Sequence, residues 1–358
     1  MHEKKQIEKK RNDPKKLWEF INSKINKKKP KQIKINYIVD ENNCKISNDK
    51  DISNYMNEYF CSIGSKLQDK IIQPPNAQVE MPPINDKTIF LEFTTYDEVI
   101  IVIDKLKLKK GGVDNISTKV IKEIAIYIAD VLCHIINLSI EKGIWPNALK
   151  TAEVIPVHKA GSKSCPSNYR PISLVSNIAK IFEKILHNRI YNFVTKCGII
   201  SDKQYGFIKK LGTKDALQYL TDILYQKLDK STPTIITFLD LAKAFDTVDH
   251  GILLSKLYRM GLRGKAHDLL SSYLTNRQQR VKTNACKSEY RNIKMGVPQG
   301  TILGPVLFIF YLNYLLIDMS KNSILSYADD TTVISAAISS FKTNGNNVKT
   351  NFYMACTK

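Results

Sequence analysis

The chain has 358 residues, of which 43% are hydrophobic and 25% are charged. This composition is that of a globular protein with a sizeable core, and it excludes a disordered or fibrous chain. The 54 Lys and Arg residues outnumber the 34 Asp and Glu residues, which gives a formal net charge of +20. Such an excess favours a polyanionic partner such as a nucleic acid, although a globular body with a basic tail has the same balance.

Cysteine usage and hydropathy indicate the compartment. The seven cysteines are dispersed, with no CxxC pair and no histidine at metal-ligand spacing, so they favour free thiols in a reducing environment. Residues 1–16 lack the apolar segment of a signal peptide, and the longest apolar stretch is interrupted by Pro305 and Asn313. We therefore expect an intracellular protein, in the cytoplasm or nucleus, without a membrane partner; no oligomeric state is predicted.

Residues 1–94 are expected to form a basic, mainly helical region. Two stretches in it, 17–25 and 52–67, have apolar residues at helical spacing, and Asp51 is the N-cap candidate of the second. A proline-rich loop, with pairs at 74–75 and 82–83, then separates this region from a larger domain that we place at 95–358.

In the larger domain, helices and strands are interspersed. Apolar spacing predicts helices at 96–109, 118–142, 178–196, 213–228, 250–260 and 303–319. The helix at 250–260 is expected to have Asp249 as its N-cap and to end before Gly261. Short β-rich runs predict strands at 153–158, 234–240, 323–328 and 331–335, and a hairpin of 279–283 with 289–295. The apolar, β-branched strand 234–240 is expected to be buried. Together these elements indicate an α+β fold whose sheet is covered by helices on one face.

Three aspartates lie at the ends of predicted strands. Asp240 ends the strand 234–240, and Asp329 and Asp330 join the last two strands. Ionised carboxylates at the rim of a core are costly unless a cation neutralises them. Mg²⁺ takes one or two carboxylates and completes its shell with water and phosphate oxygens, and a pair of such ions supports in-line phosphoryl transfer. An Asp pair between strands can also be an ordinary hairpin turn.

Several motifs resemble those of reverse transcriptases. Tyr327-Ala328-Asp329-Asp330 resembles the signature tetrad of the family, residues 238–250 (FLDLAKAFDTVDH) its first-aspartate motif, and residues 296–305 (GVPQGTILGP) its template and nucleotide motif. Shorter upstream matches are found at 112–116 (GVDNI), 145–159 (from Trp145 to VIPVHK), 168–174 (NYRPISL) and 204–207 (QYGF). Over roughly residues 95–335 the chain resembles the polymerases of non-LTR retrotransposons, in the jockey-like branch of LINE-type elements.

This resemblance implies an RNA-directed DNA polymerase with the right-hand polymerase fold, in which an antiparallel palm sheet is packed by helices and joined by fingers. It implies Mg²⁺ as the cofactor and an RNA template, a DNA primer and deoxynucleoside triphosphates as partners. Asp240, Asp329 and Asp330 match the catalytic, metal-binding acids of the family, and the carbonyl of Leu241 would complete one metal shell.

The resemblance also assigns nucleotide-binding residues. Phe245 matches the aromatic steric gate, which excludes the 2′-hydroxyl of a ribonucleotide, and Gln299 lies in the glycine-flanked loop near the incoming nucleotide. Arg170 and Lys159 match residues of the fingers that bind the triphosphate. Phe245 could instead be a core residue, and Lys159 a solvated surface charge.

The sequence departs from the family pattern at two points. Asn313 is followed by Tyr314, where family members usually have an Asp. The chain also ends 28 residues after Asp330, whereas the family continues through further palm motifs and a helical thumb. We therefore expect a core whose thumb is missing or truncated. The alternatives are an inactive relic of a retroelement and a non-catalytic fragment that binds nucleic acid.

Overall fold

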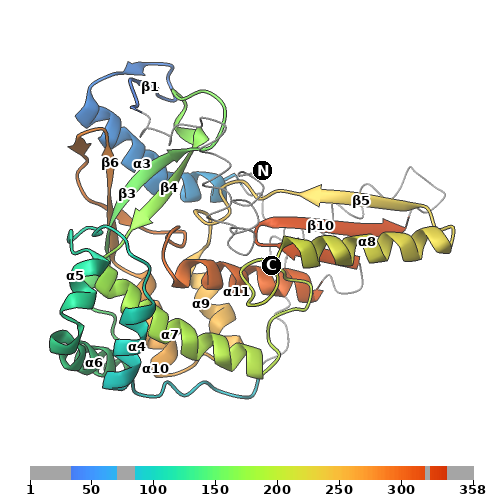
Figure 1. Cartoon of the computed structure of the whole chain (residues 1–358). Helices are drawn as coiled ribbons and strands as arrows, with labels where there is room; N and C mark the ends of the chain where they lie inside the picture. Colours follow the sequence, from blue (N-terminus) through green and yellow to red (C-terminus); the bar gives the residue numbers. More distant parts are fainter. Residues whose placement is uncertain (1–33, 71–84, 319–322, 337–358) are drawn as a thin grey trace, which may run out of the picture.

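The computed structural model of the chain describes residues 34–70, 85–318 and 323–336. Its helices and strands form a mixed α+β fold, as the sequence predicts. The two larger sheets have five and three strands. In Figure 1 the first of them lies with a group of packed helices on one side, and the second extends to the other side with a helix beside it. Residues 17–25 and 71–84, where a helix and the proline-rich loop are predicted, lie outside the described residues.

The five-stranded sheet joins segments that lie far apart in the sequence. β3 (Thr151–His158) pairs antiparallel with β4 (Tyr169–Leu174) and parallel with β6 (Arg277–Thr283). β6 also pairs antiparallel with β7 (Cys286–Lys287) and β8 (Arg291–Ile293). The hairpin predicted from residues 279–283 and 289–295 is thereby confirmed. β4 was not expected, because its short run with Pro171 does not have the alternation of a strand.

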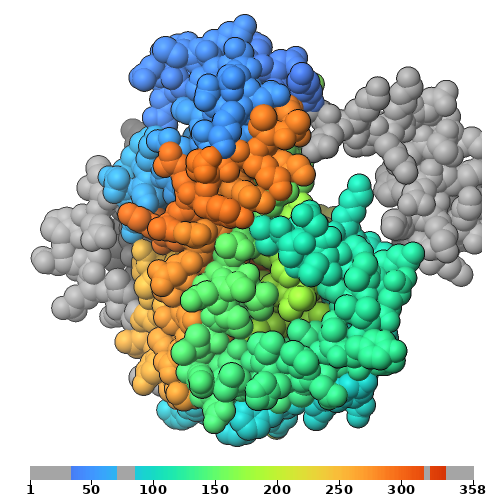
Figure 2. Space-filling model, turned by 90° about the vertical axis from the view of Figure 1, so that its left-hand side faces the viewer, coloured from blue at the N-terminus to red at the C-terminus, as the bar shows by residue number. Residues whose placement is uncertain are grey.

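Helix α3 (Asp49–Gln68) confirms the helix predicted at 52–67. Its N-cap is Asn48 instead of Asp51, because the Asn48 side chain accepts hydrogen bonds from the backbone N–H groups of Lys50 and Asp51. Figure 2 shows this N-terminal part of the chain packed against the segment that contains β6 to β8.

The buried face of α3 shares one hydrophobic cluster with strands of the larger domain. The cluster also includes the first strand of the small hairpin formed by β1 (Ile38–Val39) and β2 (Lys45–Ile46), and its buried members are Ile35, Ile38, Ile52, Met56, Phe60, Val154, Tyr169 and Val281. Residues on both sides of position 94 therefore contribute to one core. The division into domains at that position stays a prediction.

The largest core is made of helices. These are α4 (Tyr96–Lys105), α5 (Thr118–Glu123), α6 (Ala125–Lys142), α7 (Asn177–Lys196), α9 (His250–Arg259), α10 (Lys265–Leu274) and α11 (Leu303–Asp318). At its centre Trp145 is fully buried, stacks on Phe182 with ring centroids 4.2 Å apart, and meets Tyr273 edge-on at 4.9 Å. Because α11 is apolar on all sides, it can only lie inside such a core.

Several boundaries differ from the predicted ones. The helix expected at 118–142 is interrupted at Ile124, whose backbone (φ −102°, ψ 9°) leaves the helical region between α5 and α6. The helix expected at 96–109 ends four residues early, because Leu106 is extended and Lys109 donates its backbone N–H to Oγ1 of Thr118. Helix α9 has the predicted N-cap, Asp249. Helix α10 was not expected.

The three-stranded sheet has the order β5 (Thr234–Leu239), β10 (Asp330–Ala336), β9 (Ser323–Tyr327), and both pairings are antiparallel. The expectation that β5 is buried is wrong. It lies at the edge of the sheet, with Ile235 42% and Phe238 73% exposed. An apolar, β-branched composition does not distinguish a central strand from an edge strand. Helix α8 (Thr213–Asp229) lies beside this sheet and packs on β9 (Figure 1).

Candidate active site

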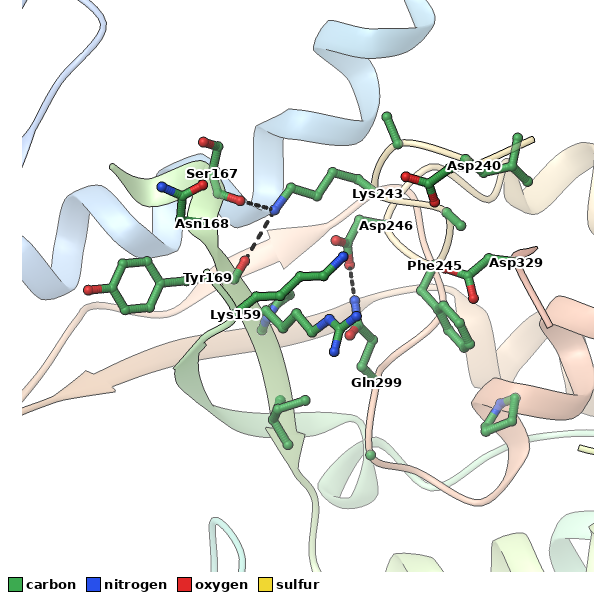
Figure 3. Close-up of a pocket in the computed structure, with 18 of the residues that line it drawn as sticks. Lys159, Ser167, Asn168, Tyr169, Asp240, Lys243, Phe245, Asp246, Gln299 and Asp329 are labelled. Atoms are coloured by element: carbon green, nitrogen blue, oxygen red, sulfur yellow. Dashed lines mark hydrogen bonds between the residues drawn. The ribbon is translucent and has the colours of Figure 1, made fainter. Parts of the chain in front are cut away.

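A pocket of about 670 Å³ lies between the hairpin of β3 and β4, the segment after β5, the loop before α11 and the β9–β10 turn. It brings together every predicted site residue except Asp330. These residues are Lys159, Arg170, Asp240, Leu241, Phe245, Gln299 and Asp329, and Phe207, Lys243 and Asp246 line the pocket with them. Figure 3 shows Asp240, Asp329 and Phe245 on one side and Lys159 on the other.

The register of the three-stranded sheet places the aspartates at one end. Leu239 of β5 is opposite Thr331 of β10, so Asp240 and the β9–β10 turn lie next to each other. Asp240 is exposed and Asp329 half-buried, and both line the pocket. Asp330 is exposed, pairs with Tyr327 as the first residue of β10, and is not part of the pocket lining.

The turn itself explains the position of Asp329. The turn consists of Ala328 and Asp329, and Ala328 has the left-handed backbone conformation (φ 60°) that reverses the chain direction within two residues. Asp329 is therefore a turn residue, and its turn opens onto the pocket. Asp329 can therefore be both a hairpin-turn residue and a site residue.

The donor set of the pocket is compatible with magnesium. Two carboxylates, those of Asp240 and Asp329, line it together. Within the described ranges, no group of three or more His, Cys, Asp or Glu side chains forms a complete metal cage. Mg²⁺ commonly uses one or two carboxylates and takes its other ligands from water and substrate phosphates. The residues thus fit an ion that is shared with a phosphate-bearing ligand.

Cationic side chains line the opposite side of the pocket. Val157 pairs with Arg170 across the β3–β4 hairpin, and Lys159 continues this pairing by donating its backbone N–H to the carbonyl of Asn168 at 2.9 Å. The side chains of Lys159 and Arg170 are exposed, and neither forms an ion pair with an acidic residue in the part of the chain that the structure describes. Both are therefore available to bind an anion.

Lys243 connects the two sides of the pocket. Its Nζ donates hydrogen bonds to the carbonyls of Ser167 at 2.7 Å and Tyr169 at 3.1 Å, as Figure 3 shows. Burial lowers the pKa of Lys243, and the neighbouring positive charges of Lys159 and Arg170 act in the same direction. No role for Lys243 is predicted from the sequence, because its hydrogen-bond partners lie more than seventy residues away.

Gln299 is fixed by contacts on both of its sides. Its Nε2 donates a hydrogen bond to Oδ1 of Asp246 at 3.0 Å, and its carbonyl accepts one from the backbone N–H of Ser173 at 2.7 Å. The glycine loop (residues 296–304) approaches the segment after β5 closely, since a Cβ on Gly296 (φ 87°) would lie 3.0 Å from Cα of Asp246. Burial raises the pKa of Asp246 to about 6, against the opposing effect of the Gln299 hydrogen bond.

Phe245 lies at the boundary between core and pocket. Its ring is partly buried, stacks on Phe308 of α11, and also lines the pocket. Phe245 is therefore both packed against the core, as one interpretation predicts, and part of the pocket lining, as the other predicts. Phe207, which is 54% exposed, contacts Phe245 in the same pocket. Phe207 is not among the predicted site residues, although it belongs to the QYGF motif at 204–207.

Comparison with known proteins agrees with the motifs. Residues 157–353 match the family model described as reverse transcriptase (RNA-dependent DNA polymerase), which is more than half of the chain. The chain belongs to the reverse transcriptase family. The polymerase from the mobile element jockey of Drosophila melanogaster is 31% identical over 253 residues, 68% of this chain and 28% of that protein.

Two other relatives from Drosophila melanogaster give the same result. The probable RNA-directed DNA polymerase from transposon BS is 31% identical over 247 residues, which cover 66% of this chain and 27% of the relative. The probable polymerase from the transposon X-element is 29% identical over 273 residues, which cover 75% of this chain and 29% of the relative. These similarities confirm the predicted resemblance to the reverse transcriptases of non-LTR retrotransposons. The chain spans less than a third of the length of these relatives.

One further observation concerns membranes. None of the helices in residues 34–70, 85–318 and 323–336 has both the length and the apolar character needed to cross a bilayer.

Proposed function

We propose that this reverse transcriptase chain provides the fingers and palm of an RNA-directed DNA polymerase. The reaction would join the 3′-oxygen of a DNA primer to the α-phosphorus of a deoxynucleoside triphosphate on an RNA template, with release of pyrophosphate. The observation that carries the proposal is that two carboxylates, Asp240 and Asp329, face exposed cations across one pocket. In this proposal the three-stranded sheet with α8 and α11 is the palm, the five-stranded sheet with α3 belongs to the fingers, and the polymerase domain spans residues 95–358.

The acidic side would bind Mg²⁺. Asp240 and Asp329 would be the ligands from the pocket, next to the carbonyl of Leu241. Asp330, which is exposed just outside the pocket, would have to turn its carboxylate inward to join them. When bound, the ions would make the primer hydroxyl more acidic and would neutralise charge that develops on the phosphates.

The cationic side would bind the triphosphate. Arg170 offers a planar fork of donors that matches phosphate oxygens, and Lys159 adds a flexible point charge. Both are exposed and unpaired with acids in the described ranges, so binding a phosphate would break no existing ion pair. Lys243 would not take part directly, because two carbonyl groups already accept hydrogen bonds from its Nζ. Its role would be to hold the cationic hairpin close to the aspartates.

The remaining residues would select the nucleotide. Phe245 would lie under the sugar, where its ring leaves no space for a 2′-hydroxyl. Gln299 would orient the nucleotide, since its amide is held by Asp246 and its backbone by β4. Hydrogen bonds that fix a side chain before the substrate arrives reduce the entropy cost of binding.

The test is primer extension by the full chain on an RNA template, with and without Mg²⁺. We expect Mg²⁺-dependent incorporation that Asp240→Asn and Asp329→Asn each reduce below detection while binding of the primer–template is retained. The matched control is Asp222→Asn on α8, an exposed aspartate whose side chain accepts a hydrogen bond from Gln218. Extension by Asp329→Asn at the wild-type rate would disprove the metal assignment. A wild-type chain that binds the primer–template but does not extend it, whichever divalent metal is supplied, would instead be a non-catalytic nucleic-acid-binding fragment.

A further inference from the structure

Phe245 is confined by two other phenylalanines. Its ring stacks on Phe308 with centroids 4.4 Å apart and 17° between the planes, and it meets the ring of Phe207 at 6.3 Å and 84°. Phe308 is 1% exposed and belongs to the largest core, whereas Phe207 is 54% exposed. The phenylalanine trio (Phe207, Phe245 and Phe308) therefore extends from the core to the surface of the pocket.

Confinement matters because a bulky side chain excludes a substrate group only if it cannot move aside. Retreat of the Phe245 ring toward α11 is blocked by Phe308, since protein interiors are packed as densely as crystals. Phe207 makes the second contact, on the side where the pocket is open to solvent. Without Phe207, the ring of Phe245 would lose this edge contact beside the pocket and would gain space to turn.

The position of Phe207 is itself fixed by the turn that carries Asp329. Gly206 lies so close to this turn that a Cβ would be 2.2 Å from the backbone nitrogen of Ala328. Oε1 of Gln204 accepts hydrogen bonds from the backbone N–H groups of Gly206 at 2.8 Å and Ala328 at 3.1 Å. The backbone N–H of Tyr205 donates to the carbonyl of Ser326 at 2.8 Å. Phe207 follows directly and has a left-handed backbone conformation (φ 58°).

We infer that Phe207 determines nucleotide specificity by holding Phe245 in place. Selection of deoxynucleotides over ribonucleotides is then a property of the phenylalanine trio and not of Phe245 alone. Phe207 is a positioning residue in this inference, because it acts through the ring of Phe245. The inference rests on the proposed function, in which Phe245 is the steric gate.

The test compares deoxynucleotide and ribonucleotide use by the full chain with a primer on an RNA template. The readout is the ratio of kcat/KM for dATP to that for ATP, measured within each variant. We expect Phe207→Ala to lower this ratio about tenfold, the size of effect that a small change in a tight pocket produces, and Phe207→Tyr to retain it because the ring remains. Phe93→Ala is the matched control, since Phe93 is 60% exposed and does not line the pocket.

A double-mutant cycle with Phe245→Ala shows whether Phe207 acts through Phe245. Once the ring of Phe245 is absent, adding Phe207→Ala should change the ratio no further. Thermal unfolding of each variant checks that the fold is intact. If the chain extends no primer, the same variants are compared by equilibrium binding of dATP and ATP in Mg²⁺.

The outcomes separate the inference from the proposed function. If Phe245→Ala lowers the ratio and Phe207→Ala leaves it at the wild-type value, the inference is wrong and the proposed function stands. Equal and additive effects of the two substitutions would also overturn the inference, because Phe207 would then act independently of Phe245. If Phe245→Ala leaves the ratio unchanged, Phe245 is not the steric gate, and that part of the proposed function fails together with the inference.

Discussion

Gln299 and Asp246 are joined by a hydrogen bond of 3.0 Å that links the glycine loop to the segment after β5. The carboxyl group of Asp246 is harder to ionise in this buried position, since burial raises its pKa from 3.8 to about 6. The bond therefore couples the position of the Gln299 amide to the protonation of Asp246, and both residues line the pocket.

We expect Asp246→Asn to change how stability depends on pH. Because the pKa of Asp246 in the folded protein is raised, its stabilising contribution is fully present below pH 3.8 and is lost as pH rises through about 6. The wild type should lose up to about 3 kcal/mol relative to the Asn variant between these pH values. Urea unfolding of both proteins from pH 4 to pH 8 measures this difference. A difference that stays constant over the range would show that Asp246 ionises as freely in the folded state as in the unfolded state.

We expect Gly64→Ala to weaken the docking of α3. A Cβ at this position would lie 2.4 Å from the carbonyl oxygen of Asp246, a backbone atom that cannot yield easily. Such overpacking typically costs about 1–3 kcal/mol of unfolding free energy. Gly251→Ala in α9 is the control, because its nearest neighbour is a side-chain oxygen of Asp249 at 3.3 Å and alanine favours a helix by about 1 kcal/mol. If chemical denaturation shows both variants to be stabilised, α3 is not docked at this point.

We expect Glu183→Ala to be strongly destabilising and Glu183→Gln less so. The buried carboxylate of Glu183 accepts hydrogen bonds from the backbone N–H of Ile302 at 2.6 Å and from the hydroxyl of Tyr273 at 3.1 Å. Alanine would leave both donors unsatisfied at a cost of roughly 2–4 kcal/mol, whereas glutamine keeps an acceptor. Burial raises the pKa of Glu183, and the hydrogen bond from Ile302 and the positive charge of Arg277 oppose this shift. Equal losses for the two variants in an unfolding experiment would show that the negative charge is what matters.

We expect residues 1–33 to add salt-sensitive affinity for nucleic acid. They contain twelve Lys and Arg residues against four Asp and Glu residues. Deleting them should lower RNA affinity at low salt and flatten the dependence of log affinity on log salt by roughly 0.7 for each lost contact with a phosphate of single-stranded RNA. Melting temperature should change little, because the cluster around Met56 and Phe60 stays intact.

The control for this deletion removes residues 1–94 and with them helix α3. That variant should have a lower melting temperature in addition to weaker RNA binding, since Ile52, Met56 and Phe60 are buried against β3, β4 and β6. Unchanged salt dependence after deletion of residues 1–33 would mean that their positive charges do not contact nucleic acid.

Local patterns in the sequence predicted the elements whose signals are local. Helices α7 and α9 match the predicted extents to within one residue, and α9 has the predicted N-cap, because apolar spacing and a capping side chain act within a few residues. The exposure of β5 could not be predicted in this way. The exposure of β5 depends on its pairing with β10, which lies more than ninety residues further along the chain. Because β10 pairs with one side of β5, β5 is an edge strand of the three-stranded sheet.

The same distinction applies to the site. Motifs selected the pocket residues Asp240, Phe245 and Gln299, and the structure places them together. The contacts of Lys243 with β4 and of Phe207 with Phe245 join segments that no periodicity connects, so these two residues had no assigned role before the structure was known.

The parallel pairing of β3 with β6 has a consequence for synthesis of the protein. Thr151 is opposite Gln278, so β3 leaves the ribosome long before its partner does. At about 5–20 residues per second, the interval is on the order of ten seconds, during which one edge of β3 has no partner strand. Helices α7 to α10 and strand β5 are translated in this interval. The nascent chain must therefore protect an open strand edge until β6 arrives, and translation pauses between residues 160 and 276 would prolong its exposure to aggregation.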